Sequence, residues 1–297
     1  MSAIILDGKK LADEILSGLK EEIKDLNKKI KLGIVLVGDD AVSLKYIEKK
    51  IKAGGELGIE VKVYKYDKDI TTKKLREEVG RICRLPNMGG VLIQLPLPSH
   101  INTQGILDAV LPQKDIDVLG AKAFGKFYAG KSPIMPPTVA GILKLLEEVP
   151  TLRCEDVGGR DPDRDKRVGK YNIEVKGRRV AVVGQGQLVG KPMSIILMQK
   201  GATVLAINEF TENKGGLIKK ADIIISGVGK PGLITKDMLK EGAVVVDAGT
   251  TVENGKLVGD VAGDVKDVAS YITPVPGGVG PMTVAMLFWN LVELTKR

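Results

Sequence analysis

The chain has 297 residues, of which 43% are hydrophobic and 28% charged, and its net charge is +8. The length suggests about two domains, and the composition is typical of a folded globular protein rather than a disordered one. Two cysteines and one histidine exclude a disulfide framework, a cysteine-rich zinc site and an HExxH metalloprotease. We therefore expect no bound metal.

The basic residues are spread along the chain and mixed with acidic ones, as on a solvated surface. This pattern, with only 4% aromatic residues, favours neither nucleic acid nor a membrane as a partner. The first residues lack a basic region followed by a long apolar stretch, and no apolar run approaches 18 residues. We therefore expect a cytoplasmic protein without a signal peptide or a membrane span.

Helical and strand patterns alternate along the first half of the chain. Apolar residues recur every three or four positions over about 8–28, which predicts an amphipathic helix. Further helices are expected at about 40–54 and 75–82, and strands at 32–37, 59–66 and 90–94. Alternation of this kind predicts a parallel sheet with helices on its faces.

The same alternation restarts in the second half. Strands are expected at 180–184, 203–207, 223–225 and 244–247, with helices at 191–199, at about 235–240 and at 281–294. We therefore predict an α/β fold of two domains, 1–138 and 139–280, with the closing segment 281–297 packing back on the first. The charged stretch 151–178 has no periodicity and is interpreted as a long surface loop, with a lid or partner contact as the alternative.

A glycine-rich turn follows the strand at 180–184. Gly184, Gly186 and Gly190 form the pattern GxGxxxG between a predicted strand and a predicted helix. In a dinucleotide-binding fold, such glycines allow a tight turn, a close approach of the pyrophosphate and close packing of helix against strand. The alternative is a turn that binds no ligand.

The residues near this turn bear on the choice between NAD and NADP. Glu209 ends the next strand, where a carboxylate accepts hydrogen bonds from ribose hydroxyls and repels a 2′-phosphate. Gln185 stands in the turn without a neighbouring arginine. Both residues favour NAD, unless Glu209 points into solvent.

Three polar residues follow the first buried strand at helical spacing. Ser43, Tyr46 and Lys50 share one helix face near the carboxyl end of a parallel strand, where ligands bind in such sheets. An ordinary surface helix is the alternative. Gln94 ends a buried strand, where its amide needs partners. Of Asp115 and Asp117, only one is expected to face a pocket.

The stretch 272–283 holds three glycines and three prolines, which excludes a helix or a strand over its whole length. It predicts a rigid loop whose backbone meets a flat ring, and Pro281 suits the first position of the closing helix. A simple hinge is the alternative. Four segments of the sequence carry a resemblance to one family by their residues, order and spacing: 94–98, 114–117, 184–192 and 273–283.

Together these pieces resemble the bifunctional methylenetetrahydrofolate dehydrogenase/cyclohydrolase family. The resemblance implies that Tyr46 packs against the folate rings, Lys50 is the catalytic lysine and Gln94 is its partner at the reacting carbon. It further implies that Asp117 anchors the pterin and that Ser43 supports Lys50 or the substrate. The remaining residues expected to bind substrate are Pro276 and Gly277, and those expected to bind cofactor are Gly184, Gln185, Gly186, Gly190, Glu209, Gly227, Gly249, Thr250 and Gly278.

The implied chemistry is oxidation of 5,10-methylenetetrahydrofolate with NAD or NADP, followed by hydrolysis of the methenyl product to 10-formyltetrahydrofolate. The family also implies a homodimer. The sequence departs from the family pattern at Gln185 and Gly186, where Arg and Ser are usual, at Asn208 and Glu209, where His and Ser are usual, and at Val118, where Gly is usual. The alternatives are a monofunctional dehydrogenase, a related dehydrogenase for another pterin carrier, and a basic nucleic-acid-binding protein.

Overall fold

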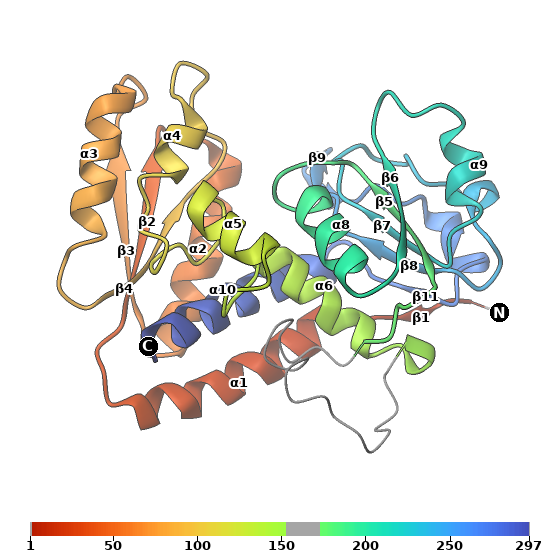
Figure 1. Cartoon of the computed structure of the whole chain (residues 1–297), viewed down its shortest axis with the longest axis horizontal. Coiled ribbons are helices and arrows are strands. Elements are labelled where there is room, and N and C mark those ends of the chain that lie inside the picture. The colour runs from red at the N-terminus through yellow and green to blue at the C-terminus, as the bar shows by residue number, and fades with distance from the viewer. Residues whose placement is uncertain (1, 153–172, 297) are drawn as a thin grey trace. The chain divides into compact units, whose positions relative to one another are not determined.

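The computed structural model describes residues 2–152 and 173–296, which form two compact units (Figure 1). The N-terminal unit comprises residues 13–137 and 284–297, and the C-terminal unit comprises residues 1–12 and 138–283. The division falls within α1 (Gly8–Leu26) and within α10 (Val279–Thr295). Both units contain a parallel sheet with helices, which agrees with the predicted α/β class.

The N-terminal unit is built on a three-stranded parallel sheet. Its middle strand, β2 (Lys31–Val37), pairs with β3 (Glu60–Tyr66) on one side and with β4 (Met88–Ile93) on the other. The helices between and after these strands are α2 (Ala41–Glu56), α3 (Thr72–Ile82), α4 (Thr103–Leu107) and α5 (Ala121–Tyr128).

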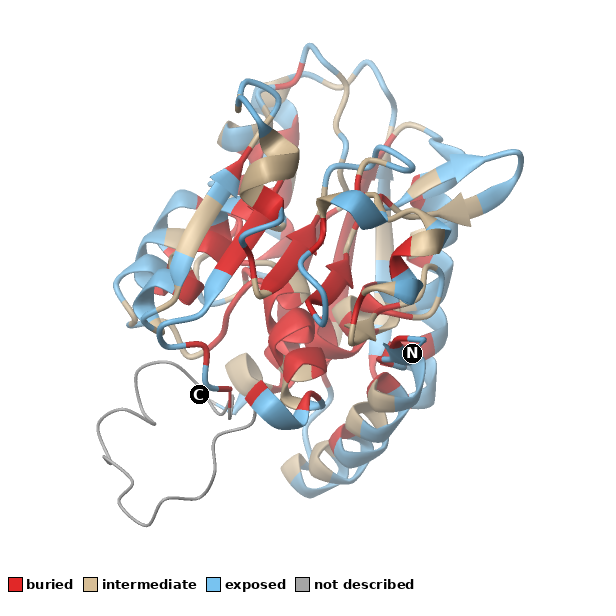
Figure 2. Cartoon of the chain, turned by 90° about the vertical axis from the view of Figure 1, so that its right-hand side faces the viewer, coloured by how far each residue is buried: buried red, intermediate tan, exposed pale blue. Residues whose placement is uncertain are grey.

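Strand β2 is apolar on both faces because each face supports a separate core (Figure 2). Leu32, Ile34 and Leu36 pack with buried residues of α2 and α10. Val35 and Val37 point to the other face, where they pack with buried residues of α3. Alternate residues of a strand point to opposite faces, so a continuous apolar run indicates a sheet covered on both sides.

The C-terminal unit contains a six-stranded parallel sheet in the order β1-β11-β8-β7-β5-β6 (Figure 1). The strands are β1 (Ile4–Ile5), β5 (Arg179–Val183), β6 (Thr203–Ile207), β7 (Ile223–Ser226), β8 (Val244–Asp247) and β11 (Tyr271–Ile272). The remaining elements are α6 (Pro137–Glu147), α8 (Gly190–Gln199), α9 (Lys214–Ile218), an antiparallel hairpin of β9 (Thr251–Glu253) and β10 (Lys256–Val258), and 3-10 turns at Pro150–Leu152, Lys236–Met238 and Gly263–Asp267.

The structure corrects two details of the sequence interpretation. The helix expected at 235–240 is only the 3-10 turn Lys236–Met238. Helix α10 begins at Val279, so Pro281 is its third residue rather than its first; the first four N–H groups of a helix lack intrahelical partners, which makes a proline harmless there. Residues 1–12 cluster with the C-terminal unit because β1 extends its sheet.

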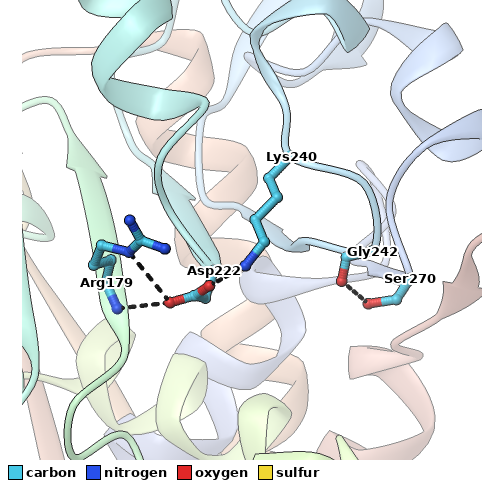
Figure 3. A network of polar contacts seen from close by, with 5 residues as sticks. All are labelled: Arg179, Asp222, Lys240, Gly242 and Ser270. Carbon is cyan, nitrogen blue, oxygen red and sulfur yellow. Dashed lines mark hydrogen bonds and ion pairs between the residues drawn. The ribbon is translucent and has the colours of Figure 1, made fainter.

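Polar contacts join four segments at the amino-terminal edge of this sheet (Figure 3). The Asp222 carboxylate, just before β7, accepts hydrogen bonds from the Arg179 backbone N–H at 2.9 Å and from the Lys240 ammonium at 2.6 Å. Burial raises the pKa of Asp222, but these donors outweigh it, so the pKa lies below its usual value. Ser270 Oγ donates to the Gly242 carbonyl at 2.7 Å. This edge lies opposite the carboxyl ends of the strands, so we assign the network to stability.

Most of the predicted loop at 151–178 lies outside the described residues. Where that loop resumes, Ile173 and Val175 are buried, and the Glu174 N–H donates to the Leu152 carbonyl at 2.7 Å. Within the described parts of the chain, no helix has the length and apolar character that crossing a membrane requires.

Candidate functional site

The first predicted site lies on α2 in the N-terminal unit. Asp40 caps this helix by accepting a hydrogen bond from the Ser43 N–H at 2.8 Å. Hydrogen bonds from the hydroxyl and the N–H of Ser43 lower the pKa of Asp40. Ser43 is therefore buried against its own helix cap, whereas Tyr46 and Lys50, on the same face, are half-buried.

Lys50 meets Gln94 across the carboxyl end of the sheet. The Lys50 Nζ donates to Gln94 Oε1 at 3.0 Å. Gln94 directly follows β4, and its Nε2 donates to the Leu95 carbonyl at 2.9 Å while its N–H donates to the Val35 carbonyl at 2.9 Å. The amide of Gln94 is thus oriented so that its oxygen, rather than its nitrogen, faces the lysine.

The two acidic residues of the segment after β4 have different environments. Asp115 is buried, and its carboxylate accepts a hydrogen bond from the Gly120 N–H at 2.8 Å. Asp117 is half-buried, and within residues 2–152 and 173–296 no side chain or backbone group donates a hydrogen bond to its carboxylate. Asp115 therefore shapes the turn, and Asp117 is the carboxylate with acceptor capacity to offer a ligand.

Val118 follows Asp117 in an unusual backbone conformation. Its φ is +59°, in the left-handed region that disfavours a β-branched residue. Its side chain is buried, with 1% of its surface exposed. The family pattern has glycine here, so the backbone shape explains that preference, and this chain keeps the shape with a valine packed inside.

Burial and the charges of Lys50 and Asp117 together shift the pKa values of these two residues. Burial lowers the pKa of Lys50, and the negative charge of Asp117 opposes this effect. Burial raises the pKa of Asp117 to about 7, with Lys50 opposing the rise and Asp115 adding to it. Burial likewise raises the pKa of Asp115 to about 6. A lysine and a carboxylate that titrate nearer neutrality than usual are suited to proton transfer.

The second predicted site is the glycine-rich turn between β5 and α8. Gly184 has a φ of +88°, and a Cβ on Gly190 would lie 1.8 Å from the Gly184 carbonyl oxygen. A Cβ on Gly186 would meet nothing within 4 Å, so the space before this backbone is open. Val189 provides no side-chain cap for α8, which leaves the helix N-terminus available to an anion. These features fit a dinucleotide pyrophosphate.

Of the two residues expected to contact the ribose, one faces the protein and the other is exposed to solvent. Gln185 turns inward, where its Nε2 donates to the Val182 carbonyl at 2.9 Å and its Oε1 accepts from Ser194 Oγ at 3.4 Å. Glu209 is exposed just after β6. The ammonium of Lys214 donates to the Glu209 backbone carbonyl at 2.8 Å, which places a cation in this loop that sequence reasoning missed.

Two buried aspartates organise the loops that follow β7 and β8. The Asp260 carboxylate accepts hydrogen bonds from Ser226 Oγ and from the N–H groups of Val228 and Lys230, each at 2.7 Å. The Asp247 carboxylate accepts from the N–H groups of Gly249, Asp260 and Val261 at 2.9 to 3.1 Å.

Close packing at these loops explains two of the predicted glycines. A Cβ on Gly249 would lie 2.2 Å from Asp260, and one on Gly184 would lie 2.9 Å from the Gly227 carbonyl. Gly184, Gly190, Gly227 and Gly249 therefore gather at one edge of the sheet. In the sequence, the one sign of these loops is that the strand expected at 244–247 ends in an acidic residue, Asp247.

The loop before α10 belongs to the C-terminal unit. Gly277 has a φ of +110°, and Gly278 is buried so that a Cβ would lie 2.6 Å from the Pro274 carbonyl. Pro276 and Thr250 are exposed. The structure thus groups Pro276, Gly277 and Gly278 with the glycine-rich turn rather than with the unit that holds Lys50 and Asp117.

Two family models match the chain. Residues 6–117 match the model described as tetrahydrofolate dehydrogenase/cyclohydrolase, catalytic domain, and residues 166–297 match the NAD(P)-binding domain of the same name. The bifunctional protein FolD of Hydrogenobaculum sp. (strain Y04AAS1) is 40% identical over 296 residues, which cover 99% of each chain.

Solved structures give the same result. The crystal structure of the bifunctional enzyme FolD, methylenetetrahydrofolate dehydrogenase/cyclohydrolase, from Campylobacter jejuni is 35% identical, with a TM-score of 0.88 over 99% of each chain. The methylenetetrahydrofolate dehydrogenase-cyclohydrolase of Trypanosoma brucei, solved with NADP and an inhibitor, is 30% identical, with a TM-score of 0.87 over 100% of this chain and 98% of that one.

Proposed function

The chain belongs to the tetrahydrofolate dehydrogenase/cyclohydrolase family, and from this premise we propose which of its residues carry out the two reactions of the family. It is an NAD(P)-dependent methylenetetrahydrofolate dehydrogenase and methenyltetrahydrofolate cyclohydrolase, and it takes a folate substrate. The observation that carries the assignment of residues is the contact of the desolvated Lys50 amine with Gln94, beside the open carboxylate of Asp117.

Asp117 is the proposed anchor of the pterin. Its carboxylate is desolvated and has no donor in the described parts of the chain, so donor N–H groups of an aminopyrimidinone would satisfy it with charge-assisted hydrogen bonds. Tyr46, one helical turn before Lys50, presents a half-buried ring to the same side of α2. We assign it to packing against the folate rings.

Lys50 is the proposed proton carrier of the cyclohydrolase step. A water molecule adds to the methenyl carbon, and its proton passes to the neutral Lys50 amine. The carbinolamine then opens: the bond between the one-carbon unit and N5 breaks, N5 takes a proton from the Lys50 ammonium, and the hydroxyl loses its proton to solvent as the formyl C=O forms, which gives 10-formyltetrahydrofolate. Burial already lowers the pKa of Lys50, and a cationic substrate lowers it further, which favours the neutral amine. Gln94 orients this amine through the 3.0 Å hydrogen bond.

The C-terminal unit binds the NAD(P) cofactor, which accepts hydride from the one-carbon unit when bound. We assign the pyrophosphate to the turn of Gly184, Gly186 and Gly190, whose backbone is open on the side of Gly186. Gly227, Gly249, Thr250 and Gly278 are the further proposed contacts. We propose that the folate site belongs to a domain of residues 1–138 with the closing segment 281–297, and the cofactor site to a domain of residues 139–280.

We propose that the enzyme prefers NAD. The exposed Glu209 carboxylate would accept hydrogen bonds from the ribose and repel a 2′-phosphate, and the amide of Gln185 is engaged with Val182 and Ser194 instead of facing outward. Lys214 acts in the opposite sense, but its ammonium is occupied by a backbone carbonyl.

The first experiment mixes the purified protein with 5,10-methylenetetrahydrofolate and either NAD or NADP, and follows reduced nicotinamide and the methenyl product. We expect reduction with NAD, and decay of methenyl faster than its enzyme-free control. Reduction only with NADP would contradict the role of Glu209. Reduction without accelerated decay would favour the monofunctional alternative.

Two variants test the assigned residues. Lys50→Met keeps the volume of the side chain and removes the amine, so cyclohydrolase activity should fall about 100-fold or more, in the range of a lost general base, and more than dehydrogenase activity does. Lys45→Met, an exposed lysine of the same helix, is the matched control. Glu209→Ser with Gln185→Arg should raise the use of NADP relative to NAD, and an unchanged ratio would show that these positions do not contact the ribose phosphate.

The resemblance to the family also leads us to propose a homodimer. Ile4 and Ile5 on the edge strand β1 are 58% and 54% exposed, and Val252 on the β9–β10 hairpin is 50% exposed. Exposed apolar residues on strand edges favour association with another chain. Sedimentation equilibrium should give twice the mass of the chain, and a monomer at micromolar concentration would refute this proposal.

A further inference from the structure

Asn290 is a buried polar residue in an otherwise apolar part of α10. None of its surface is exposed, and its neighbours Phe288 and Leu291 belong to the core of the N-terminal unit. Its Nδ2 donates to the carbonyls of Ile116 and Met135, both at 2.8 Å. Its Oδ1 is buried and has no hydrogen-bond partner in the described parts of the chain.

The amide of Asn290 is only partly satisfied, since its Nδ2 has two acceptors and its Oδ1 has no donor. An apolar residue of similar volume would remove the unpaired acceptor, but it would leave the Ile116 and Met135 carbonyls without this donor. What asparagine adds is two N–H donors at one point of the helix. They fix two backbone carbonyls from distant parts of the sequence, at Ile116 and Met135.

The Ile116 carbonyl belongs to the peptide unit that ends at the Cα of Asp117. Because a peptide unit is planar, a hydrogen bond to this oxygen sets the orientation from which the Asp117 side chain projects. On the other side of Asp117, Val118 holds a φ of +59° and the Asp115 carboxylate accepts the Gly120 N–H. The backbone around Asp117 is thus held on both sides, by Asn290 before it and by Asp115 after it.

We propose that Asn290 is a positioning residue for folate binding, which acts by fixing the peptide unit that carries Asp117. The inference rests on the proposed role of Asp117 as the pterin anchor. Asn290 itself touches no substrate in this proposal, so its effect must pass through Asp117.

The test compares Asn290→Leu with Val292→Ala. Val292 is a fully buried residue of the same helix, two positions away, and has no hydrogen bond to Ile116. Both changes should lower the melting temperature, but only Asn290→Leu should raise the KM for 5,10-methylenetetrahydrofolate, about tenfold or more. The affinity for NADH or NADPH, measured by nicotinamide fluorescence, should stay unchanged in both variants. An equal rise of KM in the two variants would overturn the proposal.

A double-mutant cycle with Asp117→Ala separates the inference from its premise. If Asn290 acts through Asp117, Asn290→Leu should raise KM in the wild-type background and leave it unchanged beside Asp117→Ala. Additive effects would show a merely structural role. If Asp117→Ala alone leaves KM unchanged, the proposed anchor is wrong and the inference falls with it; if it raises KM and Asn290→Leu does not, only the inference falls.

A second variant serves if Asn290→Leu does not fold. Asn290→Ser retains one hydroxyl donor in place of two N–H donors, so KM should rise by less than tenfold but beyond that of Val292→Ala. A KM equal to that of Val292→Ala would overturn the proposal.

Discussion

Replacing Asp117 by asparagine should stabilise the ligand-free enzyme, and the gain should grow as the pH rises from about 4 to about 7. Burial raises the pKa of Asp117 from 3.8 to about 7 in the folded protein. Between these values the folded state binds more protons than the unfolded state, so the free energy of unfolding falls as the pH rises from about 4 to about 7. Above pH 7 the full destabilisation by the ionised carboxylate is present.

The magnitude follows from the pKa shift. A shift of about three units corresponds to about 4 kcal/mol. The carboxylate is half-buried rather than fully enclosed, and asparagine also removes the negative neighbour of Lys50, so we reduce the expected gain to about 2 kcal/mol at pH 8. At pH 4 the wild-type carboxyl is largely protonated, and the two proteins should differ little.

The assay is urea denaturation of both proteins without ligand at pH 4.5, 6 and 8. Trp289, the one tryptophan of the chain, lies on α10 within the N-terminal unit, so its fluorescence reports the unfolding of that unit. Asp69→Asn, an exposed aspartate of the same unit, is the control for the loss of one carboxyl group. A difference for Asp117→Asn that does not grow with pH, or a loss of stability at pH 8, would refute the reasoning.

Three further predictions concern the C-terminal unit. Asp222→Asn should lower its free energy of unfolding by about 1 kcal/mol at pH 7, measured by denaturation, and this loss should disappear as the pH falls below 3.8 towards the lowered pKa of the folded state. Asp260→Asn should weaken NADH binding at least about tenfold in a fluorescence titration, because its amide nitrogen would face the N–H of either Val228 or Lys230; unchanged affinity would show that these loops do not hold the cofactor. Gly190→Ala should abolish NADH binding in the same titration while the circular dichroism of the protein is kept, since the new Cβ would overlap the preceding turn.

The longer sheet strands could be predicted because most are short apolar runs between turn residues, and β3 alternates apolar and polar residues. The strand expected at 203–207 has the same limits in the structure, and most others differ by one or two residues. The short elements could not be predicted, since α4 and α9 have five residues each and the strands β1 and β11 have two. Segments this short carry no periodicity, and their conformation depends on tertiary contacts.

The site was predictable where a residue type is unusual for its position, as for Gln94 at the end of a buried strand. The site was not predictable where a polar side chain can either face solvent or form a hydrogen bond with a nearby backbone group. Gln185 turns inward to Val182, and the Lys214 ammonium binds a carbonyl of its own loop. Asn290 stands among apolar residues of a helix, and only its two long-range partners show why an amide is needed there.

The carboxylates of this protein separate into structural and functional ones by their donors. Asp260 is buried and accepts three hydrogen bonds from Ser226 and two backbone N–H groups, which leaves it little capacity for a ligand. Asp117 is also desolvated, yet the described parts of the chain provide it with a neighbouring charge, Lys50, and with no donor. A desolvated carboxylate without donors destabilises the free protein and gains most from a ligand that brings them. The same property that should make Asp117→Asn stabilising is therefore what makes Asp117 fit to bind the pterin.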